Sequence, residues 1–72
     1  MKNFKVTAHA EERLTKTVIS ESRSETVSNG KGLFSGANTV EKVKELYESF
    51  WNDLNPLSFE IVIVETVEEI NN

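Results

Sequence analysis

Histidine and cysteine are the side chains that most often carry catalysis or hold metals, and this chain has few of them. Its 72 residues include one histidine, His9, and no cysteine. Thiol nucleophiles, redox pairs, cysteine-rich zinc sites and paired-histidine metal sites are therefore excluded, and no serine lies in a GxSxG nucleophile elbow. We interpret His9, beside Glu11 and Glu12, as a solvent-facing strand residue. The sequence predicts a protein that is not an enzyme and has no catalytic residues, cofactor or metal site.

A glycine-rich segment is the second candidate for chemistry. Gly30-Lys31-Gly32, followed by Gly36, has the glycines and lysine of a phosphate-binding loop, but no Ser or Thr follows the lysine as a P-loop requires. We interpret the segment as a turn and a connector. The alternative hypothesis is a small-ligand-binding protein, in which the loop at 30–36 takes a nucleotide or metabolite and Arg23 and Lys31 contact its phosphate.

Charge is divided unevenly along the chain, whose net charge is −4. Residues 1–36 carry six basic and four acidic side chains, whereas residues 37–72 carry two basic and eight acidic ones. Nucleic-acid binding is disfavoured because it needs a basic surface, while an acidic helix face suits a basic protein partner. We therefore predict a partner-binding surface that comprises Glu41, Glu45, Glu48, Arg23 and Trp51.

An amphipathic pattern predicts one helix that begins after Asn38 and ends at Asn55-Pro56. Asn38 with Glu41 three residues later is typical of a capping box, and the residue before proline avoids the helical conformation. Apolar side chains recur at helical spacing, namely Val40, Val43, Leu46, Tyr47, Phe50, Trp51 and Leu54. We expect this side to pack as core, its aromatic residues included, with either Phe50 or Trp51 at the margin.

Strands are predicted on both sides of this helix. Residues 3–9 alternate apolar and polar side chains, residues 15–27 begin with a β-branched run, and residues 57–70 form the last strand. Residues 10–14 are expected to form a loop or one helical turn, and Asn29-Gly30 predicts a tight turn into a short third strand at 31–34. The fold class is thus α+β, a single small two-layer domain over residues 1–72. An antiparallel sheet of three to four strands packs on one helix, in the order ββ(β)αβ.

The last strand has apolar side chains on both faces at Ile61, Val62, Ile63 and Val64. A right-handed crossover gives the sheet order second, first, last, which leaves this strand at an edge although its pattern is typical of a covered strand. Either it is central, beside a further strand, or it pairs with a second copy. Because so short a chain buries little surface, we predict a homodimer whose interface includes these four residues.

Residues at about 20–37 are expected to form a flexible arm or loop. The Ser-Glu-Ser-Arg-Ser-Glu stretch at 20–25 is either an edge whose charges block aggregation or a segment that pairs with a partner by strand addition.

The leading interpretation is a small acidic protein-interaction module that binds itself and an unidentified protein. Its start has no apolar stretch typical of a signal peptide, and its longest apolar run, at 61–64, is too short to cross a bilayer. We therefore expect a cytoplasmic protein with no membrane contact. The abundance of Asn, Lys, Glu and Ile is typical of low-GC bacteria and their phages and plasmids, so we interpret the chain as an accessory or inhibitor protein of such an element.

Overall fold

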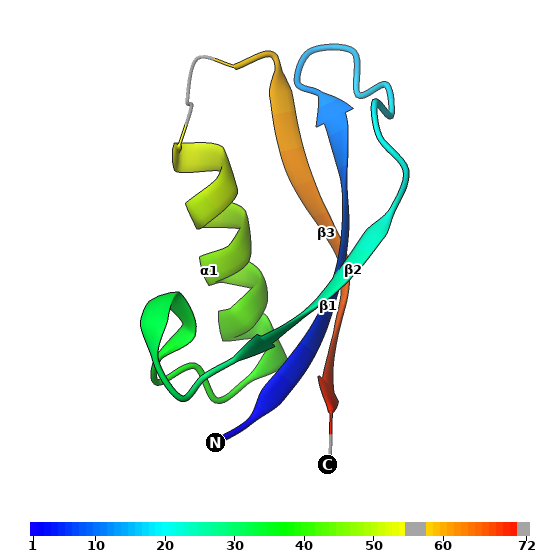
Figure 1. The fold of residues 1–72 in the computed structure, drawn as a ribbon. Coiled ribbons are helices and arrows are strands. Elements are labelled where there is room, and N and C mark those ends of the chain that lie inside the picture. Colours follow the sequence, from blue (N-terminus) through cyan, green and yellow to red (C-terminus); the bar gives the residue numbers. More distant parts are fainter. Residues whose placement is uncertain (55–57, 71–72) are drawn as a thin grey trace.

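The computed structural model of the chain describes residues 1–54 and 58–70. The elements are β1 (Asn3–Glu12), β2 (Arg23–Ser28), a short 3-10 helix η1 (Gly32–Phe34), α1 (Val40–Asp53) and β3 (Glu60–Ile70). The strands form one antiparallel sheet in the order β2-β1-β3, and α1 lies along one face of it (Figure 1). The predicted α+β class and the predicted sheet order are both confirmed.

The first strand is longer than predicted and the second is shorter. β1 runs through residues expected to form a loop, because it pairs with β3 as far as Glu12 opposite Glu60. The β-branched run at 15–19 makes only an isolated bridge between Glu11 and Val18. There the chain bends, since Lys16 has a positive φ of 64°. The backbone N–H groups of residues 19 and 20 both donate to the Ala10 carbonyl, at 2.8 and 3.4 Å. β2 therefore begins only at Arg23.

The connection from β2 to α1 also differs from the prediction. The 3-10 helix η1 stands where a third strand was expected, and the positive φ angles lie at Gly32 and Gly36, not at Gly30. The predicted tight hairpin turn at Asn29-Gly30 is therefore wrong. Asn29 instead donates from Nδ2 to the Ala37 carbonyl at 2.8 Å, which holds the connection against the start of the helix. The segment at 20–37 thus contains both β2 and η1.

The N-cap of α1 is Thr39, so the predicted capping box of Asn38 and Glu41 is wrong. Thr39 has an extended backbone, and its Oγ1 accepts a hydrogen bond from the Lys42 N–H at 3.1 Å. The third helical position is therefore Lys42, which cannot complete a capping box with a carboxylate. The helix ends at Asp53 with Leu54 as its C-cap, and the predicted stop at Asn55-Pro56 lies outside the described residues.

A β-bulge shifts the alternation of the last strand, so that Val67 packs on the same face as Val62 and Val64. Thr7 pairs with Thr66 but Ala8 pairs with Val64, so Glu65 is an extra residue in β3. The extra residue reverses the alternation, and Val62, Val64 and Val67 consequently all pack toward the core. The buried core beneath α1 is small and consists of Phe4, Val6, Ala8, Ala37, Val43 and Val64.

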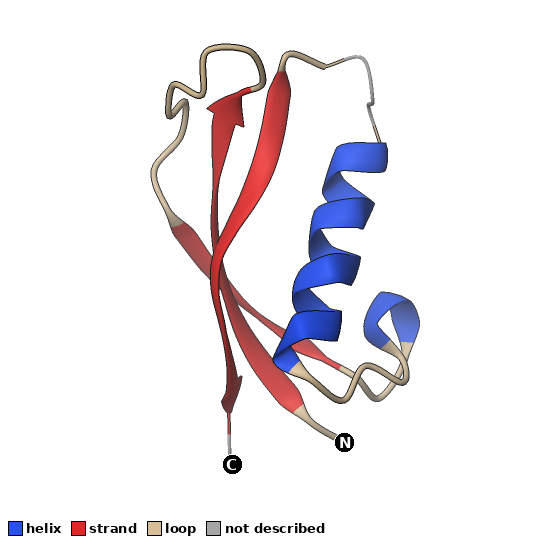
Figure 2. Ribbon diagram, turned by 180° about the vertical axis from the view of Figure 1, so that it is seen from behind, coloured by secondary structure: helices blue, strands red, loops and turns tan. Residues whose placement is uncertain are grey.

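The molecule is elongated, with extents of 38 × 20 × 15 Å. Both termini lie at one end, and the C-terminal end of α1, the start of β3 and the β1–β2 connection lie at the other (Figures 1 and 2). None of the described helices has the length and apolar character needed to cross a membrane.

Candidate functional site

Large apolar side chains are exposed at the C-terminal end of α1 and the start of β3. The exposed fractions are 41% for Phe50, 45% for Trp51, 62% for Leu54 and 75% for Phe59. The prediction that the whole apolar side of the helix packs as core is therefore wrong beyond Tyr47. We call these four residues the aromatic end.

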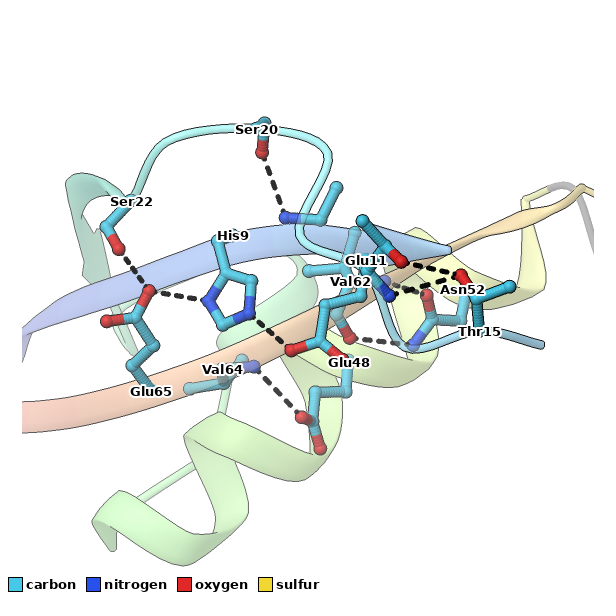
Figure 3. A network of polar contacts seen from close by, with 12 residues as sticks. His9, Glu11, Thr15, Ser20, Ser22, Glu48, Asn52, Val62, Val64 and Glu65 are labelled. Carbon is cyan, nitrogen blue, oxygen red and sulfur yellow. Dashed lines mark hydrogen bonds and ion pairs between the residues drawn. The ribbon is translucent and has the colours of Figure 1, made fainter. Parts of the chain in front are cut away.

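Two polar side chains of α1 bind the backbone of β3 beside the aromatic end. Asn52 donates from Nδ2 to the Val62 carbonyl at 3.2 Å and accepts from the Val62 N–H at 2.7 Å. One turn earlier, a Glu48 carboxylate oxygen accepts from the Val64 N–H at 3.1 Å. The last turns of α1 thus present the polar side chains Glu48 and Asn52 to the backbone of β3. Figure 3 shows these contacts.

The acidic residues predicted to act together are divided between different roles. Glu41 and Glu45 are exposed on the helix, and Glu45 forms an ion pair with Lys42 at 3.5 Å. Glu48 is half-buried and bound to the backbone of β3. Glu48 is therefore not part of an open acidic helix face.

Arg23 and Trp51 were predicted to share a partner-binding surface, and the structure brings them together. Both line a hollow of about 250 Å³ between the sheet and α1, with Tyr47 and Ala8 on its walls. A second hollow of about 280 Å³ adjoins it and includes Glu25. Together the two hollows form a groove, which we call the β2 groove, between α1 and β2 on the face of the sheet that carries the helix.

The aromatic rings along this side of α1 are in contact with one another. The Tyr47 and Trp51 ring centroids are 6.4 Å apart, and Phe50 meets Trp51 edge-on at 5.3 Å. Burial and, second, the neighbouring Glu25 carboxylate together raise the pKa of the Tyr47 hydroxyl to about 12. The Tyr47 hydroxyl is therefore neutral at physiological pH, and the only formal charges on the groove's lining belong to β2 and to His9.

The two cations of the alternative ligand site are not brought together. Arg23 is the first residue of β2, and Lys31 follows the last. A strand advances about 3.3 Å per residue, which separates the ends of β2 by roughly 16 Å. Lys31 and Arg23 therefore lie near opposite ends of that strand (Figure 1) and do not contact one phosphate group.

His9 lies at the centre of a polar network on the sheet face that α1 does not cover (Figure 3). Its Nε2 is 2.6 Å from a Glu11 oxygen, and its Nδ1 is 2.6 Å from a Glu65 oxygen. The Ser22 hydroxyl donates to that same Glu65 oxygen. The network joins β1, the bulge of β3 and the segment that leads into β2. The prediction of a merely solvent-facing His9 missed these contacts.

The two carboxylates set the charge of the imidazole. The hydrogen bond with Glu11, and then the one with Glu65, raise the pKa of His9. The hydrogen bond from Ser22, followed by that from His9, lowers the pKa of Glu65. When the imidazole is protonated, both ring nitrogens donate to these carboxylates, and the ring has no lone pair to take up a proton or bind a metal. In the described part of the chain, no group of three His, Asp or Glu side chains is placed to hold a metal ion.

The four residues predicted as a dimer interface face different ways. Val62 and Val64 pair with Ala10 and Ala8 on the helix side, and their backbone groups contact Asn52 and Glu48. Ile61 and Ile63 alternate with them and therefore lie on the uncovered face of the sheet. Strand pairing through this part of β3 would have to displace both helix side chains.

Comparison of the chain with protein-family models, with curated proteins and with solved structures finds no match. The interpretation of its function therefore depends on the geometry of the aromatic end, the β2 groove and the sheet edges.

Proposed function

We propose that the protein is a non-enzymatic interaction module that binds another protein through the aromatic end. The observation that carries this proposal is the exposure of Phe50, Trp51, Leu54 and Phe59 at one end of a molecule in which six of the described residues form the buried core. Isolated apolar residues on a surface are ordinary, but a contiguous patch marks an interaction site.

Trp51 joins Phe50 and Leu54 into one surface, and the exposed Phe59 lies just before β3 in the chain. Phe50 meets Trp51 edge-on, and Trp51 and Leu54 border a hollow of about 280 Å³. Ser58 and Glu60, the neighbours of Phe59 in the chain, line the same hollow. Aromatic residues clustered in this way are typical of the few positions that dominate the affinity of protein interfaces.

Acidic side chains outnumber basic ones around the aromatic end, where Arg13 donates from Nε to the Ser58 carbonyl at 3.3 Å. Asp53 adjoins Leu54, and Glu60 adjoins Phe59. The last turn of α1 contains no basic residue, so the partial negative charge of the helix C-terminus is not offset there. An amphipathic segment with apolar residues on one side and lysine or arginine at its margins would complement this surface in shape and charge.

The single tryptophan of the chain lies in the proposed surface, so its fluorescence reports on binding directly. We would titrate the protein with a helical peptide built from leucine and lysine, and with its leucine and glutamate counterpart. The basic peptide is expected to shift the Trp51 emission to shorter wavelength and to saturate, because it removes the indole from water. The acidic peptide is expected to have no effect.

Matched variants at the two ends of the molecule test the location. Leu54→Ser should weaken binding of the basic peptide by about tenfold or more, as expected for a central apolar contact. Leu33→Ser is the control, because Leu33 is similarly exposed but lies in η1. An unchanged Trp51 emission, or an equal loss of affinity in both variants, would contradict the proposal.

A further inference from the structure

The two edges of the sheet differ in whether their outward-facing backbone groups already have hydrogen-bond partners. At the centre of the β3 edge, Asn52 is hydrogen-bonded to both outward-facing backbone groups of Val62, and Glu48 accepts from the N–H of Val64. β2 forms the other edge and pairs with β1 alone, and its first four residues are exposed. An open edge strand is a template for pairing with another strand.

The register shows which backbone groups of β2 face outward. The carbonyls of Lys2 and Ala10 accept from the N–H groups of Asn29 and Ile19, so even-numbered residues of β1 turn their backbone toward β2. Their partners in β2 are Arg23, Glu25 and Val27. Because backbone directions alternate along a strand, the N–H and C=O groups of Ser24 and Thr26 point away from the sheet.

We infer that a second copy of this chain pairs with this edge, β2 against β2 in antiparallel orientation, with Ser24 on the two-fold axis. In that register Arg23 lies opposite the partner's Glu25, and Glu25 lies opposite the partner's Arg23. The backbone groups of Ser24 exchange hydrogen bonds with the partner's Ser24, and those of Thr26 do so with the partner's Ser22. The inference does not depend on the partner protein proposed above.

Charge complementarity singles out this register. Arg23 and Glu25 pair with Ala8 and Val6, so both side chains lie on the side of the sheet that carries α1. Opposite residues of a pair that exchanges no backbone hydrogen bonds have their side chains closest together. Among the ion pairs of the described residues, neither Arg23 nor Glu25 takes part. Pairing about Ser24 would give each of them an opposite charge.

The exposed area of the chain also suits a second copy. The monomer exposes 5067 Å², whereas a compact protein of 8.1 kDa is expected to expose about 4,500 Å². Joining the two β2 strands makes one continuous sheet with both α1 helices on the same face. It also closes the open side of each β2 groove. A homodimer is thus retained, but its interface moves from β3 to β2.

Charge reversal provides the direct test. Wild-type protein should sediment as a dimer at high micromolar concentration. Arg23→Glu and Glu25→Arg should each raise the dimer dissociation constant by about tenfold or more, because two attractive cross-strand pairs become repulsive. An equimolar mixture of the two variants should form a heterodimer, and the double variant should dimerise again. Glu45→Arg, on the exposed side of α1, is the matched control and should leave the dimer unchanged.

A second variant separates loss of the interface from loss of the fold. Thr26→Pro removes an N–H group that points away from β1, so it blocks strand addition without breaking the existing sheet. Circular dichroism should show a folded chain, and sedimentation should show a monomer. A strictly monomeric wild type would overturn the inference. So would a Thr26→Pro protein that still dimerises, or single charge variants that dimerise as tightly as the wild type.

Discussion

At the scale of single residues, the one histidine of the chain lies at the centre of a polar network. His9 donates to carboxylates of Glu11 and Glu65, both at 2.6 Å, and through Glu65 it is joined to Ser22. A charged imidazolium between two carboxylates connects three segments of the chain. We infer that the His9 network holds the segment before β2 against β1 and β3, and so keeps β2 aligned with the sheet.

This arrangement predicts a pH dependence of stability. The pKa of His9 is raised above 6.5, so its contribution is complete below that pH and is lost as pH rises through the raised value. The pKa of Glu65 is lowered below 4.5, so its contribution is complete above that pH and is lost as pH falls through the lowered value. The melting temperature should therefore gain most from this network between pH 4.5 and 6.5.

The measurement is the melting temperature of wild type and His9→Gln across acid and alkaline pH. The difference between the two proteins should be largest in the stated window and should shrink on the alkaline side, as the wild-type imidazolium loses its proton. Glu45→Gln, an exposed carboxylate on α1, is the control. Parallel pH profiles for wild type and His9→Gln would show that the network adds no pH-dependent stability.

At the scale of elements, the key contact is the one in which side chains at the end of α1 bind the backbone at the edge of β3. Asn52 makes two hydrogen bonds to the backbone of Val62, in the manner of a neighbouring strand, and Glu48 makes one to Val64. The strand edge is thereby closed without a further strand. Beside these contacts, Phe50, Trp51 and Leu54 stay exposed at the end of the helix.

Asn52→Ala tests how much the contact between Asn52 and the Val62 backbone contributes to stability. The substitution leaves the Val62 N–H and C=O without their helix partner, so the free energy of unfolding should fall by about 1 to 2 kcal/mol. Urea unfolding at constant protein concentration measures the change, and Ser49→Ala, at an exposed position on the same helix, is the control. Equal stability of the Asn52→Ala and Ser49→Ala proteins would mean that water replaces the Asn52 contacts without cost.

The sequence predicted the features that depend on near neighbours in the chain better than those that depend on tertiary pairing. Helical spacing and alternation depend on near neighbours in the chain, and they predicted α1 and the first part of β1, whereas the sheet order was predicted from the handedness of the crossover. The bulge at Glu65 and the Asn52 contact with Val62 depend on tertiary pairing, and no local pattern indicates either. The same holds for the binding residues: Arg23 and Trp51 were both suspected, but the groove they share follows from the way β2 enters the sheet.

At the scale of the whole molecule, a small core is combined with two surfaces suited to association. Six buried residues hold the sheet to α1, the β2 edge has a self-complementary charge pattern, and the aromatic end lies opposite the termini (Figure 1). A dimer through β2 would display two aromatic ends on one sheet face. Such a dimer would bind a partner that repeats its basic apolar segment more tightly than a single copy can.

The central claim, that the aromatic end is the docking surface, is tested most directly by site-specific photocrosslinking in the native host. A photoreactive phenylalanine analogue would replace Trp51 in one protein and Glu45, an exposed residue of the same helix, in another. We predict a discrete adduct with another protein from position 51 and none from position 45. Adducts from position 45 alone, or from neither position, would contradict the claim.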